Sequence, residues 1–123
     1  MGLFSKKSLT EIINKNFNER QIEYDVKDSI ISFSISLDND ITLYPNIKVD
    51  NRAEELTFII NIKRGDSKAI KDFNNKSKYL TALVNDNIVY LYYSCFATSE
   101  NVIFIIDTII SSLQVLENDI INL

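Results

Sequence analysis

Apolar and polar residues alternate with two different periods along this chain of 123 residues. Near the N-terminus, Ser8 and Glu11 form a capping box, in which each side chain satisfies a free backbone N–H of a helix start. Four apolar residues then recur at the spacing of one helix face: Leu9, Ile12, Ile13 and Phe17. The pattern predicts a helix over Leu9–Glu19 whose apolar stripe packs in the core rather than on a partner.

Several later segments alternate with period two, as strands with one covered face do: Ile22–Val26, Ile31–Leu37, Ile41–Val49, Leu56–Ile62, Tyr79–Val84 and Ile88–Phe96. Pro45 cannot donate a ladder hydrogen bond, so we expect its strand to lie at a sheet edge or to be bulged. The last two segments are joined across residues 85–87, an Asn-Asp-Asn sequence that tolerates the positive φ of a tight hairpin.

Two further helices are expected. Asp66 or Ser67 can cap a short helix that runs to about Lys76, near which an Asn-Asn pair is interpreted as a helix stop. Thr98 or Ser99 opens a last helix that runs to about Ile121. The order α-β-β-β(β)-α-β-β-α predicts one α+β domain over residues 1–123, an antiparallel sheet flanked by helices, with residues 1–7 as a flexible N-terminal segment.

The last predicted strand is apolar on both faces, which one layer of helices does not explain. One face carries Ile88, Tyr90, Tyr92 and Phe96, and the other carries Val89, Leu91, Tyr93 and Cys95. Exposed apolar patches usually mark interfaces, and Tyr suits them because its ring buries area while its hydroxyl finds a polar partner. We therefore predict a protein-binding surface of Tyr79, Leu83, Tyr90, Tyr92 and Phe96. The alternative is that a helix or loop covers the second face.

The last helix carries a heptad-like apolar seam, formed by Val102, Ile106, Ile109, Leu113, Leu116 and Ile120. We favour packing of this seam on the chain's own sheet over a coiled coil. Near its start the helix is apolar around more than half of its circumference, so a second packing contact, besides the one with the sheet, could also cover it there.

The residue inventory argues against catalysis. The chain has no His, which excludes imidazole-based schemes, and only two Gly, which excludes phosphate-binding loops. Its one cysteine, Cys95, is interpreted as a small buried hydrophobe, and residues 38–40 (Asp-Asn-Asp) as a turn rather than a metal site. We predict no catalytic residue, no cofactor and no metal, and hence a protein that is not an enzyme.

Charge, hydropathy and cysteine content indicate which classes of partner and which cellular location to expect for this protein. A net charge of −4 argues against binding driven by nucleic-acid phosphates. No stretch approaches the roughly 20 apolar residues of a membrane span, so no membrane partner is expected. A lone Cys fits a reducing cytoplasm. The abundance of Ile, Asn and Lys, which share AT-rich codons, is typical of a low-GC bacterium or its phage.

The stretch from Ile70 to Tyr79 (IKDFNNKSKY), followed by a hairpin and by a helix opened at Ser99-Glu100, resembles the YbjN-like family. The fold of that family is shared with type III secretion chaperones. The resemblance implies an α-β-β-β-α-β-β-α sandwich that is often dimeric, lacks catalytic residues and binds another polypeptide or has a regulatory role.

Two functional hypotheses follow. The leading one is a non-enzymatic, chaperone-like or regulatory domain, homodimeric, that binds a polypeptide through apolar and aromatic surface. The alternative is a small acidic immunity or inhibitor protein that neutralises a basic toxin or nuclease by charge complementarity. Its working face would carry Asp38, Asp40, Asp50, Glu54 and Glu55.

Overall fold

A computed structural model describes residues 8–38, 40–64 and 67–123, and the structural statements below concern these residues. The expectations for residues 1–7, for Asn39 and for Asp66 as a cap lie outside them. The elements follow in this order: α1 (Leu9–Glu19), β1 (Tyr24–Lys27), β2 (Ile30–Phe33), β3 (Ile35–Ser36), β4 (Thr42–Leu43), β5 (Asn46–Asp50), β6 (Glu55–Arg64), α2 (Ser67–Lys76), β7 (Thr81–Asn85), β8 (Ile88–Phe96), α3 (Val102–Val115) and α4 (Glu117–Ile121).

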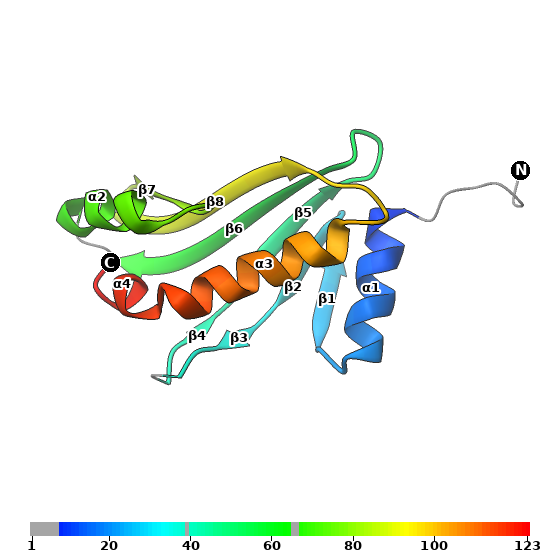
Figure 1. The fold of residues 1–123 in the computed structure, drawn as a ribbon, viewed down its shortest axis with the longest axis horizontal. Coiled ribbons are helices and arrows are strands. Elements are labelled where there is room, and N and C mark those ends of the chain that lie inside the picture. The colour runs from blue at the N-terminus through cyan, green and yellow to red at the C-terminus, as the bar shows by residue number, and fades with distance from the viewer. Residues whose placement is uncertain (1–7, 39, 65–66) are drawn as a thin grey trace, which may run out of the picture.

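The expected fold class is confirmed: six antiparallel strands form one sheet in the order β1-β2-β5-β6-β8-β7, and β3 and β4 form a separate two-stranded ribbon. α3 crosses one face of the sheet diagonally, α1 lies beside β1, and α2 lies at the β7 end (Figure 1). We call the sheet face under α3 the inner face and the opposite one the outer face.

The predicted strands Ile31–Leu37 and Ile41–Val49 are each broken in two. Pro45 lies between β4 and β5, where its missing N–H costs no ladder bond, and its carbonyl oxygen accepts a hydrogen bond from the Phe33 N–H at 3.2 Å. The expectation that this strand lies at an edge is wrong, because β5 pairs with β2 on one side and β6 on the other. The break lets the β3–β4 ribbon leave the sheet and bury its own apolar residues, Ile35, Leu37 and Leu43.

Local turn and cap chemistry sets several boundaries. Ser8 Oγ accepts a hydrogen bond from the Glu11 N–H at 3.1 Å, and α1 has the predicted bounds. Asp86 and Asn87 have φ of 51° and 64°, so the predicted tight hairpin is confirmed, with Asn85 belonging to β7 rather than to the turn. The last helix differs from expectation, because it is interrupted at Leu116 and continues as α4.

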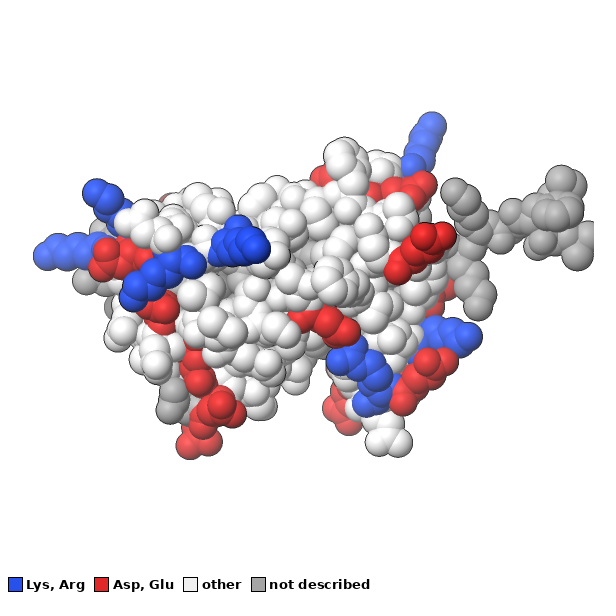
Figure 2. All heavy atoms as spheres, viewed as in Figure 1, with Lys and Arg blue, Asp and Glu red and all other residues white. Residues whose placement is uncertain are grey.

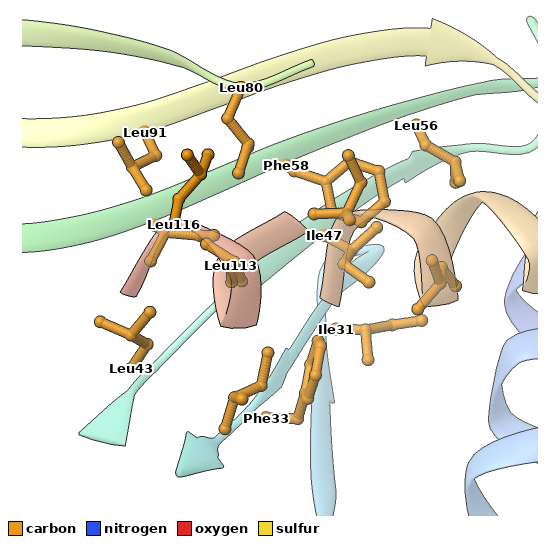
Figure 3. Packing of buried hydrophobic residues seen from close by; sticks show 14 of the residues in the cluster. Ile31, Phe33, Leu43, Ile47, Leu56, Phe58, Leu80, Leu91, Leu113 and Leu116 are labelled. Atoms are coloured by element: carbon orange, nitrogen blue, oxygen red, sulfur yellow. The ribbon is translucent and has the colours of Figure 1, made fainter. Parts of the chain in front are cut away.

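One hydrophobic core lies between the inner face and the helices. Figure 3 shows side chains of the sheet, such as Ile47 and Phe58, gathered with Leu113 and Leu116 from the C-terminal part of the chain. The whole predicted seam of the last helix is buried, as is the predicted stripe of α1 apart from half-buried Ile12. Both assignments to the core are therefore confirmed.

No helix in the described ranges is long and apolar enough to cross a membrane.

Candidate protein-binding surface

The two faces of β8 have very different surroundings. Val89 and Leu91, on the inner face, are fully buried in the core. Tyr92, whose side chain projects from the outer face, keeps 37% of its surface exposed, and Ile88 is also exposed. The buried residues of the helices all pack in the core on the inner side. The outer face of β8 is therefore an apolar surface that the described chain leaves open.

Strand register gathers the exposed apolar residues into one patch. Tyr92 lies opposite Ile59 of β6 on one side and Thr81 of β7 on the other. Tyr90 lies opposite Leu83, so the three strands place these side chains on the same face. We call the following set the outer patch: Ile59, Leu83, Ile88, Tyr90 and Tyr92. Ile59 and Tyr90 are half-buried, and the other three are exposed.

Phe96 shares the outer face but stands apart from the outer patch. Ser94 separates it from Tyr92, and the Ser94 hydroxyl donates to Glu55 Oε1 at 3.0 Å. Thr57 Oγ1 lies 3.3 Å from Ser94 Oγ, which extends this polar cluster across β6 and β8. Phe96 is 75% exposed beyond the cluster. The predicted surface is thus divided by hydrogen-bonded polar groups.

Tyr79 does not belong to the outer face, so the prediction that grouped it with Leu83 is wrong in its geometry. β7 begins at Thr81, and the chain before it is bent, with the Ser77 hydroxyl donating to the Leu80 carbonyl at 2.6 Å. The bend ends the period-two alternation before it reaches Tyr79. The Tyr79 ring instead meets the Tyr93 ring edge-on, 5.9 Å between centroids, on the inner side.

The free edge of β7 is blocked at Ala82 by a side chain of α2. Asn74 Nδ2 donates to the Ala82 carbonyl at 3.1 Å, and the Ala82 N–H donates to Asn74 Oδ1 at 2.7 Å. The amide thereby makes the pair of bonds that a neighbouring strand residue would make. α2 ends at Lys76, as expected, and the contact to Ala82 is a role of Asn74 that the sequence analysis did not predict. A helix–strand contact of this kind has no signal in the local sequence.

A second apolar surface, which the sequence patterns did not identify by residue, lies along the solvent side of α3. Phe104 is 72% exposed and Val115 is 81% exposed. They border a groove of about 430 Å³ between α3 and the α2–β7 connection, lined by Lys76, Lys78, Tyr79, Phe104, Asp107, Thr108, Ser111, Ser112, Val115 and Leu116. A search for apolar residues outside the buried seam of the last helix would have found Phe104 and Val115.

The acidic residues of the alternative hypothesis do not form one face. Asp38 and Asp40 flank the tip of the β3–β4 ribbon, whereas Asp50, Glu54 and Glu55 lie at the β5–β6 connection. These two loops lie at opposite ends of the molecule (Figure 1). A single acidic surface for a basic toxin is therefore not assembled from these residues.

Cys95 lies half-buried on the inner face, opposite Leu56. Burial raises the pKa of its thiol, and Glu55 adds to this rise, while a hydrogen bond with Tyr93 opposes it. A raised pKa leaves less thiolate near neutral pH, so this group is a weak nucleophile. Within the described residues, no three His, Cys, Asp or Glu side chains are grouped so that they could hold a metal ion.

Comparisons with known proteins found no matching family model and no match among curated proteins.

Proposed function

We propose that this chain is a non-enzymatic protein-binding domain, chaperone-like or regulatory, that forms a homodimer through the outer patch. One observation carries the proposal: the outer face of β8 displays large apolar and aromatic side chains that the described chain leaves uncovered. Contiguous apolar surface of this kind is rarely left open to water in a functioning protein.

The composition of the outer patch supports a protein partner over other ligands. Its members are aliphatic residues and tyrosines, with no charged side chain, as in the centre of protein interfaces. The patch spans three neighbouring strands on one face of the sheet, which suits face-to-face packing of two sheets about 10 Å apart. Two copies related by a two-fold axis would each cover the other's tyrosines.

The closed edge of β7 supports packing through the face rather than through the edge. Asn74 already occupies the N–H and C=O of Ala82, which another strand would need for pairing. The resemblance of the Ile70–Tyr79 region to the YbjN-like family also favours a dimeric, non-catalytic protein that binds a polypeptide. We place this activity in the cytoplasm, because the free Cys95 thiol suits a reducing compartment.

A pair of matched substitutions tests the dimer. Tyr92→Glu puts a charge at the centre of the outer patch, and Tyr44→Glu makes the same change at a tyrosine that is exposed outside it. We expect wild type and Tyr44→Glu to show twice the 14.2 kDa chain mass in light scattering at tens of micromolar. Tyr92→Glu is expected to be a folded monomer, because an unpaired charge in a desolvated interface is costly. A wild-type monomer, with Tyr92→Glu equally soluble and stable, would remove the proposal.

A further inference from the structure

The groove beside α3 has a shape that fits another helix. Phe104, Thr108, Ser111 and Val115 follow one another by four, three and four residues, so they form a single stripe on α3. The stripe spans about 16 Å at 1.5 Å per residue, or about three helical turns. The residues at its two ends, Phe104 and Val115, are bulky and apolar, and the residues in its middle are small. Small residues between bulky ones let the side chains of a second helix approach closely.

Two of the three hydroxyls that α3 contributes to the groove, those of Thr108 and Ser112, are hydrogen-bonded within α3. Thr108 Oγ1 donates to the Phe104 carbonyl at 2.8 Å, and Ser112 Oγ donates to the Thr108 carbonyl at 2.9 Å. These bonds to the preceding turn leave the hydroxyls with little need of water. The middle of the groove can therefore be covered by an apolar side chain at a low desolvation cost.

One rim of the groove is basic in an acidic protein. Residues 67–79 contain four lysines and one aspartate, although the whole chain has a net charge of −4. Blue side chains, with red ones among them, lie around α2 beside the largely uncharged surface over α3 (Figure 2). Lys76 Nζ already pairs with Asp119 at 2.9 Å. Lys78 Nζ lies 5.5 Å from the centre of the Tyr79 ring and forms no ion pair within the described residues, so it is open to an added carboxylate.

We propose that this groove binds an acidic amphipathic helix of another polypeptide. Apolar residues of that helix pack between Phe104 and Val115, and a carboxylate on its flank pairs with Lys78. Groove-to-groove contact between two copies of this chain would bring two lysine-bearing rims into one interface, which favours an acidic partner instead. The site lies on the helix side of the molecule, so it is independent of the dimer proposed at the outer patch.

Two synthetic peptides of about 15 residues, roughly four helical turns, serve as probes. Both carry leucines at one helix face, and the remaining positions are Glu in one peptide and Lys in the other. Fluorescence anisotropy with the full chain is expected to show saturable binding of the Glu peptide, weakened by added salt because the rim is exposed. The Lys peptide is expected to bind at least about tenfold more weakly.

Variants of the groove locate the binding. The double variant Phe104→Ser, Val115→Ser removes two exposed side chains, so the fold is expected to persist, and affinity for the Glu peptide is expected to fall by about tenfold or more. Lys78→Gln is expected to weaken binding and to reduce its dependence on salt. Tyr92→Glu, on the outer face, is the matched control and leaves peptide affinity unchanged.

Four binding results would overturn this proposal. They are no saturable binding up to about 1 mM, equal binding of both peptides, affinity that is unaffected by the double variant, and affinity that is lost in Tyr92→Glu. A change of oligomeric state in the double variant would also overturn it, because the groove would then be covered by a second copy. The light-scattering test at Tyr92 stands apart from all of these results, so either proposal can fail while the other survives.

Discussion

The inner and outer faces of the β7–β8 hairpin carry similar amounts of apolar side chain but differ in how far these side chains are buried. Leu91 on the inner face is fully buried. Its partner on β7 is Ala82, and the next residue, Leu83, lies on the outer face and is 39% exposed. The difference does not lie in residue type or strand geometry. It comes from the helices, which pack against the inner face and leave the outer face open. The hydrophobicity of a side chain therefore makes its burial favourable, but it does not determine which other part of the structure covers it.

The largest expected effect tests this comparison with the same substitution on each face. Leu91→Ala leaves a cavity in a packed core and is expected to cost about 3 kcal/mol of unfolding free energy. Leu83→Ala removes a side chain that is partly exposed and is expected to cost less than about 1 kcal/mol. Urea denaturation at a protein concentration low enough to keep the chain monomeric measures both values. Equal losses would mean that the two faces are equally covered within one chain.

The edge of the hairpin gives the next effect. Asn74→Ala removes both side-chain bonds to Ala82 and leaves the backbone groups of the β7 edge open, which is expected to cost about 2 kcal/mol. Asn75→Ala, at the next residue of α2, changes an exposed side chain and is expected to cost less than about 0.5 kcal/mol. Thermal unfolding of both variants checks the difference. A neutral Asn74→Ala would show that β7 does not depend on this contact.

The pH dependence of cysteine alkylation on the inner and on the outer face gives a further comparison. Because burial raises the pKa of Cys95, its thiol stays neutral to higher pH than the usual value of about 8.5. The stability contributed by the neutral thiol is full below about pH 8.5 and is lost as pH rises through the folded pKa. The alkylation rate of Cys95 by iodoacetamide is expected to rise at higher pH than that of Tyr92→Cys in a Cys95→Ser background. If the alkylation rates of the two cysteines rose at the same pH, the raised pKa of Cys95 would be contradicted.

The smallest effect is expected at Phe96. Phe96→Ser deletes a large ring, yet that ring is mostly in water, so the unfolding free energy of the monomer is expected to change by less than about 0.5 kcal/mol. Denaturation at low protein concentration measures it. A loss above about 1 kcal/mol would indicate that Phe96 packs within its own chain.

Features that depend on neighbours in the chain were predictable. The bounds of α1 follow from the Ser8–Glu11 cap, and the β7–β8 turn follows from residues that accept positive φ. The bounds of β8 match the prediction, as does the burial of the α3 seam. Three members of the predicted surface, Leu83, Tyr90 and Tyr92, lie on one face as expected. In each case the responsible contact lies a few residues away or follows from a strand's period.

Features that depend on contacts between distant segments were not predictable. Pro45 was expected to mark an edge strand or a bulge, but it marks the place where the β3–β4 ribbon leaves the sheet while β5 stays inside it. Tyr79 lies on the inner side because of a bend before β7, and the contact of Asn74 with the β7 backbone was not expected. The groove exists only when the α2–β7 connection lies beside α3. Capping and alternation are short-range properties of the chain, whereas coverage of a face, closure of an edge and the shape of a groove arise only when remote elements pack together.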